Sequence, residues 1–122
     1  MTSRILIPSL DSEGTVVADH FGRAPFFAVI DLDNIGVMIE KKVHPNASQH
    51  SGGRGHAHNN VLKYNPCAVI VQGMGPRGIK SFQAQNIAVL KANSRSIPEI
   101  VQAYNRNDLQ ELTEGCADAH HH

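Results

Sequence analysis

The stretch Cys67–Ala92, CAVIVQGMGPRGIKSFQAQNIAVLKA, decides the fold class. It begins with a continuous apolar run, CAVIVQ, and ends with a second one, IAVLKA, and both have the length and composition of buried strands. Between them, Pro76 follows a glycine-rich turn and stands where the first turn of a helix tolerates proline. A strand, a helix and a strand in this order predict two parallel neighbours joined by a right-handed crossover.

The N-terminal half of the chain is interpreted as three further strands. RILIP (Arg4–Pro8) is a short apolar run, PFFAVIDLD (Pro25–Asp33) is a longer one, and VMIEKKV (Val37–Val43) has a partly polar end. Only residues 34–36 connect the second run to the third, which predicts an antiparallel hairpin. We therefore expect an α/β fold with one mixed five-stranded sheet in the order 3-2-1-4-5, its second strand antiparallel and helices around it.

The clearest local signature of a helix is SIPE, which makes Ser96 the predicted N-cap and Glu99 its partner in a capping box. Four apolar or aromatic residues follow at helical spacing, namely Ile97, Ile100, Val101 and Tyr104. After a break at residues 105–108, Leu109 and Leu112 are predicted to continue a short amphipathic piece. Another short helix is expected to end before Pro66.

The composition excludes several classes of protein. The 122 residues are 41% hydrophobic and 18% charged, which is typical of a globular protein. Lys+Arg and Asp+Glu number 11 each and Trp is absent, so neither nucleic acid nor an anionic membrane is an expected partner. The apolar runs are too short to span a bilayer and the N-terminus lacks a signal-peptide pattern, so we expect a cytoplasmic protein. Cys67 and Cys116 are too few for a disulfide scaffold.

The stretch ADHFGRAPFF (Ala18–Phe27) places His20 and Arg23 on either side of Phe21 and Gly22, directly before the second strand. A turn here is expected to need Gly22, but it needs neither the imidazole nor the guanidinium. The stretch follows the first strand, and the glycine-rich turn follows the fourth. If these strands are parallel neighbours, both loops lie at the edge where open α/β sheets bind ligands. The alternative for His20 is a histidine that only caps a turn.

The glycine-rich turn GMGPRG (Gly73–Gly78) matches the pattern G-x-G-x-x-G after a strand and at the start of a helix. A dinucleotide site also needs an acidic residue at the end of the next strand, and that strand ends VLKAN. We therefore reject a nucleotide site and expect Gly73 and Gly75 to let a ligand approach the backbone, while Arg77 favours an anion. The alternative is a tight strand-to-helix turn with a solvated Arg77.

Four of the eight histidines lie in the polar, glycine-rich segment His44–Asn60, HPNASQHSGGRGHAHNN, which we expect to be a mobile loop. In an extended segment His56 and His58 would point the same way and share a metal, whereas on a helix they would point apart. Metal binding and simple solvation therefore both stay open for this pair. For His44 and His50, solvated loop positions are preferred.

The chain ends with GCADAHHH, Gly115–His122, which combines one thiol with three imidazoles. Such donors suit soft or borderline metals, but an inert, flexible end is the preferred interpretation. We accordingly expect one domain over residues 1–113, followed by a flexible cysteine- and histidine-containing tail over residues 114–122.

Together these motifs make the chain resemble the dinitrogenase iron-molybdenum cofactor biosynthesis family. The resemblance is carried by DHFGRAPFF, the glycine- and histidine-rich loop, and GMGPRGIKSF, and it extends from RILIPSLD to SIPEIVQAY. The family implies a ribonuclease H-like fold. It also implies binding of an iron–sulfur or molybdenum-containing cluster, not catalysis, with His20 of the HFG motif as a cluster ligand. Expected partners are the cluster itself and proteins that donate or accept it.

The residues fit such a carrier, because an anionic metal–sulfur cluster suits an imidazole on a metal, arginine charge and nearby glycine amides. Reversible binding favours one protein ligand over the four cysteines of a permanent site, and Cys67 is interpreted as a core residue. The predicted cofactor-binding residues are His20, Gly22, Arg23, Gly73, Gly75 and Arg77. The predicted metal ligands are His20, His56 and His58.

Two other functions are weighed against the carrier. The first is an anion- or metal-responsive protein-interaction module that binds no cluster. The second is an enzyme acting on a small phosphorylated substrate, for which the sequence offers no evident pair of nucleophile and base. We therefore expect that the protein is not an enzyme.

Overall fold

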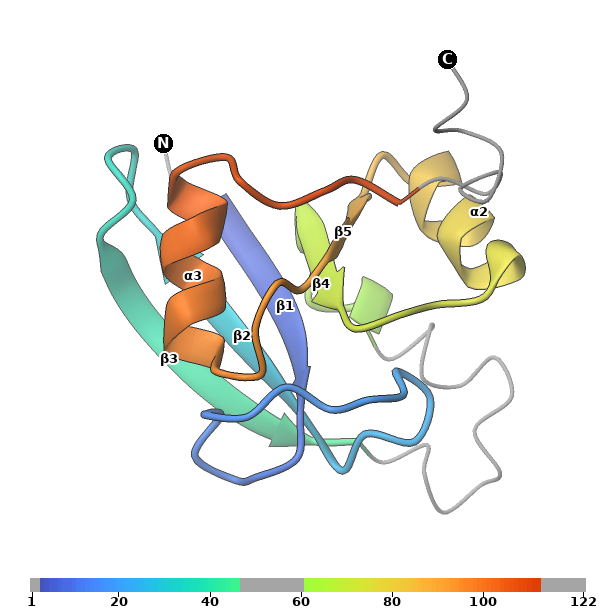
Figure 1. Ribbon diagram of the computed structural model, residues 1–122, viewed down its shortest axis with the longest axis horizontal. Helices are drawn as coiled ribbons and strands as arrows, with labels where there is room; N and C mark the ends of the chain where they lie inside the picture. Colours follow the sequence, from blue (N-terminus) through green and yellow to red (C-terminus); the bar gives the residue numbers. More distant parts are fainter. Residues whose placement is uncertain (1–2, 47–60, 113–122) are drawn as a thin grey trace.

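The computed structural model of the chain describes residues 3–46 and 61–112. Within these ranges five strands form one mixed sheet in the order β3-β2-β1-β4-β5 (Figure 1). The strands are β1 (Ser3–Ser9), β2 (Phe26–Leu32), β3 (Met38–Pro45), β4 (Ala68–Val71) and β5 (Ala88–Lys91). β2 is antiparallel to both of its neighbours, whereas β1, β4 and β5 are parallel. The predicted strand order and the antiparallel second strand are confirmed.

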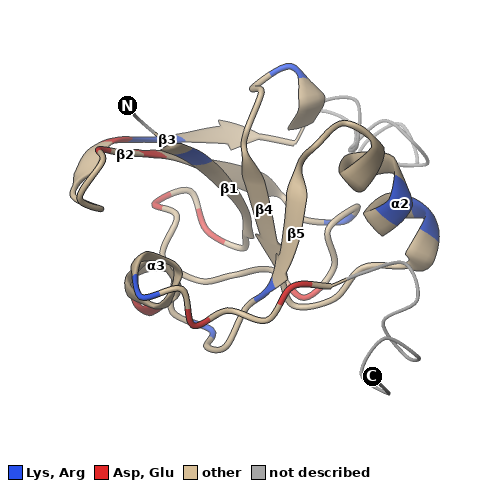
Figure 2. Ribbon diagram, turned by 90° about the horizontal axis from the view of Figure 1, so that it is seen from above, with Lys and Arg blue, Asp and Glu red and all other residues tan. Residues whose placement is uncertain are grey.

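The helices α2 (Pro76–Ala84) and α3 (Ile97–Asn105) lie on opposite faces of this sheet (Figure 2). In β1, Leu6 packs into the apolar cluster on the α2 side, and Ile5 and Ile7 pack into the cluster on the α3 side. Strand segments covered on both faces are rich in apolar residues at successive positions, which explains the continuous apolar runs. Neither helix is long and apolar enough to cross a membrane, and the same holds throughout the described ranges.

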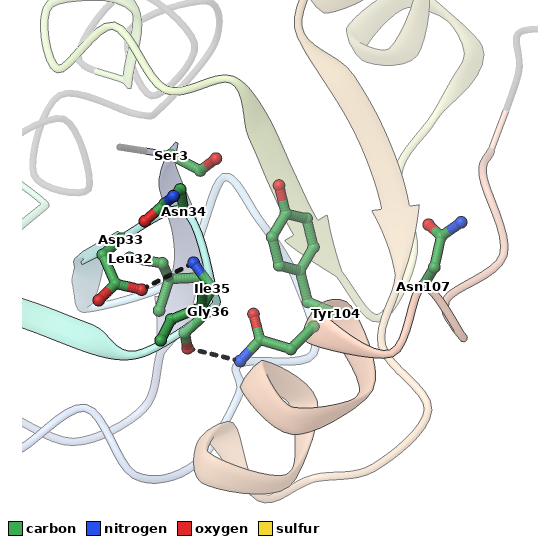
Figure 3. A pocket seen from close by; sticks show the side chains of 9 residues that line it. Ser3, Leu32, Asp33, Asn34, Ile35, Gly36, Tyr104 and Asn107 are labelled. Atoms are coloured by element: carbon green, nitrogen blue, oxygen red, sulfur yellow. Dashed lines mark hydrogen bonds between the residues drawn. The ribbon is translucent and has the colours of Figure 1, made fainter. Parts of the chain in front are cut away.

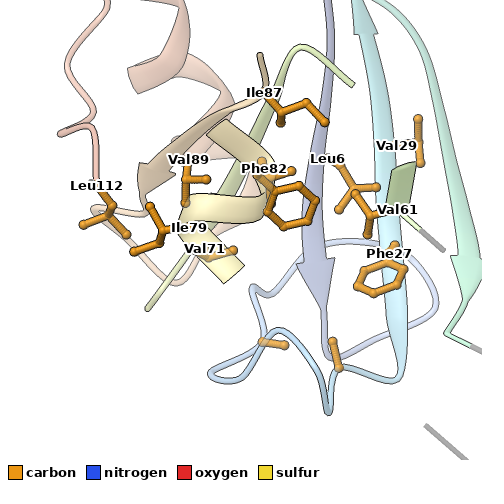
Figure 4. Packing of buried hydrophobic residues seen from close by; sticks show 13 residues of the cluster. Leu6, Phe27, Val29, Val61, Val71, Ile79, Phe82, Ile87, Val89 and Leu112 are labelled. Atoms are coloured by element: carbon orange, nitrogen blue, oxygen red, sulfur yellow. The ribbon is translucent and has the colours of Figure 1, made fainter. Parts of the chain in front are cut away.

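The cluster on the α2 side is the core that supports the loops at the carboxyl edge of the sheet (Figure 4). Phe82 of α2 and Phe27 of β2 are its largest members, and both are almost fully buried. Val61 is also fully buried there and is helical at the boundary of the described part. The short helix expected before Pro66 is therefore seen at residues 61–62, and its preceding residues lie outside the described ranges.

The N-cap of α3 is as predicted, but the capping box is closed by a different residue. The Ser96 hydroxyl accepts a hydrogen bond from the Glu99 backbone N–H at 3.4 Å. The Ser96 N–H donates to the Ser94 hydroxyl at 3.1 Å, and this hydroxyl donates in turn to the Glu99 carboxylate at 2.8 Å. Ser94 thus relays the contact that Glu99 makes directly in the simple motif.

The piece predicted as amphipathic around Leu109 and Leu112 is an extended segment along the outer edge of β5. The Lys91 N–H donates to the Gln110 carbonyl at 2.8 Å, and the Leu112 N–H donates to the Val89 carbonyl at 2.7 Å. An open strand edge leaves backbone groups without partners, and this antiparallel contact supplies some of them.

The interpretation of Cys67 as a core residue is wrong, because full burial begins one position later at Ala68. The Cys67 thiol is exposed and lies 3.6 Å from the Tyr104 hydroxyl. Burial of the ring, followed by the contact with Cys67, raises the pKa of Tyr104 to about 12. Both side chains lie at the amino edge of the sheet.

Candidate functional site

Phe21 fixes the turn that carries His20 and Arg23. Its ring centroid lies 5.4 Å from that of Phe27 in β2 and 5.6 Å from that of Phe82 in α2. These contacts bind the turn to the core on the α2 side, whereas His20 and Arg23 are exposed on either side of it. Phe21 is therefore the anchor of the turn, and the exposed side chains of His20 and Arg23 are accessible to a ligand.

Asn46, directly after β3, supports the same turn from the other side. Its side chain is buried, with 2% of the residue exposed, and its amide donates to the Ala24 carbonyl at 2.8 Å. Its backbone N–H donates to the Pro25 carbonyl at 2.9 Å. No local pattern in the sequence predicts this role of Asn46, because its partners lie far back along the chain.

The expectation that the turn needs Gly22 is wrong. In the described part of the chain the glycines with positive φ are Gly14 at 69° and Gly36 at 91°, so Gly22 adopts a conformation open to other residues. A Cβ added at Gly22, Gly73 or Gly75 would meet no described atom within 4 Å. Within residues 3–46 and 61–112, neither backbone conformation nor packing explains a glycine at these three positions.

These glycines surround a hollow of about 570 Å³, which we call the glycine hollow. It lies between the turn after β1 and the loop after β4, at the shared carboxyl edge of these parallel strands. The hollow is lined by Asp19, His20, Phe21, Gly22, Arg23, Gln72, Gly73, Met74, Gly75 and Gly78. Five of the six predicted cofactor-binding residues are thus brought together.

The sixth predicted residue, Arg77, does not line the glycine hollow. It is exposed near the start of α2, beside the N-cap Gly75, and α2 has no acidic residue in its first turn. Its charge therefore acts from outside the hollow. The predicted metal ligands His56 and His58 lie outside the described residues, as do His50 and the tail 114–122.

His44 is placed in β3 and not in a solvated loop. Its ring stacks on that of Tyr64 with centroids 4.8 Å apart, and the residue is half-buried. The first residues of the segment expected to be a loop, His44 and Pro45, therefore belong to β3, and residues 47–60 are outside the described ranges.

The electrostatics of the glycine hollow favour an anion. Asp19 is the acidic residue among its lining residues, and its carboxylate lies 3.2 Å from the Arg95 guanidinium. Arg23 lines the same space. Among residues 3–46 and 61–112, no group of three or more His, Cys, Asp or Glu side chains is placed to hold a metal ion. The hollow therefore offers a metal one imidazole, together with positive charge for the anion that surrounds it.

A second hollow, of about 390 Å³, lies at the opposite edge of the sheet between the β2–β3 hairpin and the end of α3 (Figure 3). Two of its polar side chains, those of Asp33 and Asn105, bond to the backbone of the hairpin. The Asn105 amide donates to the Gly36 carbonyl at 2.8 Å, and the Asp33 carboxylate accepts from the Ile35 and Val37 N–H groups at 3.0 and 2.9 Å. The Asn105 bond joins the hairpin to α3 and the Asp33 bonds shape the hairpin, so we interpret this hollow as a structural junction.

Comparison with known proteins confirms the resemblance that the motifs predicted. The model of the family described as dinitrogenase iron-molybdenum cofactor matches residues 3–107. The chain belongs to the dinitrogenase iron-molybdenum cofactor family. An uncharacterized protein of Methanocaldococcus jannaschii is 27% identical over 107 residues, which cover 85% of this chain and 89% of that protein.

Two solved structures share the fold of this family member. The crystal structure of PH0822 has a TM-score of 0.76 and 24% identity, and the match covers 88% of this chain and 93% of that one. The apo form of the orange protein from Desulfovibrio gigas has a TM-score of 0.73 and 20% identity, covering 89% and 92%. At these identities the likeness concerns the fold alone.

Proposed function

We propose that the chain binds and carries an anionic metal–sulfur cluster, of iron–sulfur or iron–molybdenum type, in the glycine hollow. The observation that carries the proposal is that Gly22, Gly73 and Gly75 leave open the space that their Cβ atoms would fill. Membership of the dinitrogenase iron-molybdenum cofactor family supports this class of cargo. A cluster is several atoms wide and presents sulfides to its surroundings. Backbone without side chains on two sides lets such a cluster approach closely.

His20 is proposed as the protein ligand to a metal of the cluster. It is exposed at the rim of the hollow, and the neighbouring Phe21 holds the turn in place. Arg23 in the hollow and Arg77 beside it supply positive charge for the sulfides. One metal bond and a set of weaker contacts permit release, which a carrier between a cluster donor and an acceptor protein requires.

Several further expectations belong to the same proposal. We infer a ribonuclease H-like fold and one domain over residues 1–113, with residues 114–122 as a flexible tail, in a cytoplasmic protein without enzymatic activity. His56 and His58, which lie outside the described residues, stay predicted metal ligands.

Anaerobic reconstitution with iron, sulfide and molybdate, read by absorbance and metal analysis, tests the proposal. We expect His20→Ala to weaken cluster binding by more than about tenfold, or about 1.4 kcal/mol, because a metal bond is lost. Arg23→Ala and Arg77→Ala should weaken it less, and more visibly at low salt, because they act through charge. Unchanged binding by His20→Ala, together with loss of binding on deletion of residues 117–122, would assign the ligand to the tail instead.

Substitution of a glycine distinguishes an effect on cluster binding from an effect on the stability of the fold. We expect Gly73→Ala to weaken cluster binding by more than about tenfold while the free energy of unfolding stays equal or rises by up to about 1 kcal/mol. Gly36→Ala is the matched control, because Gly36 has φ of 91° and its added Cβ would lie 2.8 Å from the Asn105 side chain. It should lower stability by about 1–3 kcal/mol and leave the affinity of the folded protein unchanged.

Two outcomes would replace the carrier by another function. A parent protein that never retains a cluster, yet binds a partner protein in the presence of anion or metal, would be an interaction module. Turnover of a small phosphorylated compound at this hollow would make the protein an enzyme. Equal cluster binding by the parent and Gly73→Ala would remove the observation on which the proposal rests.

A further inference from the structure

Gly78 is the fourth glycine of the hollow, and it differs from the other three. An added Cβ at Gly78 would lie 2.8 Å from the Sδ atom of Met74 and 2.9 Å from its Cγ atom. No ordinary Cβ contact is that short, so the Met74 side chain occupies the place that any other residue at 78 would fill. Both residues line the glycine hollow.

The glycine at position 78 is costly for the helix, because glycine inside a helix is less stable than alanine. Its φ is not in the left-handed region, so the backbone does not require it. The neighbour that a side chain at 78 would have to displace is Met74, which is half-buried and packs against the apolar cluster on the α2 side. The absence of a side chain at Gly78 therefore leaves room for the Met74 side chain against the first turn of α2.

We propose that the Met74–Gly78 pair sets the width of the glycine hollow and so selects a multi-atom cluster over a small oxyanion. When Met74 packs on Gly78, its thioether lies against α2 and the space toward the turn of residues 19–23 stays open. We expect a larger residue at 78 to displace Met74, whose side chain is flexible, into that space. This inference rests on the proposed function and names the feature that determines the size of its cargo.

The test compares four proteins, namely the parent, Gly78→Ala, Met74→Ala/Gly78→Ala, and the control Ser81→Ala. Ser81 is exposed on α2, so Ser81→Ala raises helix propensity without touching Met74. Binding of the reconstituted cluster and of molybdate alone is measured for each protein. In parallel, the methyl signal of Met74 is followed by NMR, which is practical because the chain has only three methionines.

We expect Gly78→Ala to lose at least tenfold in affinity for the cluster and less than threefold for molybdate. The double variant should regain cluster binding, and Ser81→Ala should match the parent. The Met74 methyl signal should shift in Gly78→Ala and stay in place in Ser81→Ala. Equal cluster affinity of Gly78→Ala and the parent would overturn the inference, as would failure of the double variant to recover.

The two proposals fail in distinguishable ways. If the parent binds no cluster, the proposed function fails, and the methyl signal alone tests whether Met74 packs on Gly78. An unshifted Met74 signal in Gly78→Ala would then refute this packing. If the parent binds the cluster through His20 but Gly78→Ala binds equally well, the carrier stands and only the role of Met74 is refuted.

Discussion

Asp11 accepts several hydrogen bonds that hold the loop between β1 and the turn with His20. Its Oδ1 atom accepts hydrogen bonds from the Thr15 N–H at 2.9 Å and the Val16 N–H at 3.2 Å, and its Oδ2 atom accepts from the Thr15 hydroxyl. The Ser9 hydroxyl adds a further donor at 2.8 Å. These donors, the Thr15 hydroxyl first, outweigh partial burial and hold the pKa of Asp11 well below its usual range.

This lowered pKa predicts a loss of stability in acid. A carboxyl whose pKa is lower in the folded state stabilises the fold above its unfolded pKa of about 4, and this contribution is lost as the pH falls further. We expect the free energy of unfolding of the parent to fall more steeply between about pH 5 and 3 than that of Asp11→Asn. Asparagine keeps an acceptor for the same N–H groups but does not titrate. Parallel pH profiles of the two proteins in urea unfolding would contradict this.

At the scale of elements, the two edges of the sheet are treated differently. β5 is covered by residues 110–112, whereas the outer edge of β3 pairs with no described strand. That edge carries the exposed Lys41 and Lys42 and a register irregularity opposite Asp31 and Leu32. Charged residues and bulges discourage pairing with another chain. One edge is therefore closed by the protein's own backbone and the other is protected by charge.

The cover of β5 depends on Leu112, whose side chain packs into the core cluster on the α2 side with only 8% of the residue exposed. We expect Leu112→Ala to lower the free energy of unfolding by about 2 kcal/mol, at the low end for a buried leucine because the site is at an edge. The Lys91 amide, bonded to this segment, should exchange with solvent faster. Gln110→Ala is the control, since it changes an exposed side chain and keeps the backbone bond, and should alter stability by less than about 0.5 kcal/mol. A stable Leu112→Ala protein with a protected Lys91 amide would show that the cover is not needed.

At the scale of the described molecule, two apolar layers share one set of strands. Side chains of β1 and β4 alternate between the cluster under α2 and the cluster under α3, so neither layer can lose its packing without disturbing the other. Tyr64 packs against the first cluster and Tyr104 against the second. The two tyrosines of the chain therefore report on opposite faces of the sheet.

This arrangement predicts a single cooperative unfolding transition. Tyrosine fluorescence of Tyr64→Phe reports the α3 face, and that of Tyr104→Phe reports the α2 face. Within each variant, we expect the fluorescence transition in urea to coincide with the loss of far-ultraviolet circular dichroism. A fluorescence midpoint clearly below the circular dichroism midpoint in one variant would mean that its face loosens first.

The local patterns were sufficient for the elements and their order. Apolar runs, a three-residue connection and a strand–helix–strand unit predicted the sheet, because buried strands and crossovers obey rules that depend on composition and chirality. The pattern also placed the stretch around His20 and the GMGPRG turn at one edge. Local signals failed where residues far apart in the chain determine the structure. Leu112 lies in an extended segment beside β5, and Cys67 is exposed although it begins an apolar run.

The sequence by itself determined the strand order, the N-cap at Ser96 and the glycine- and histidine-bearing loops that meet at one edge of the sheet. Only the tertiary structure decided that Gly22 is not required by its turn, that Asn46 supports that turn and that Gly78 makes room for Met74. The physical reason is that propensity and periodicity act between near neighbours. An open space, by contrast, is defined by side chains and backbone that meet only after folding.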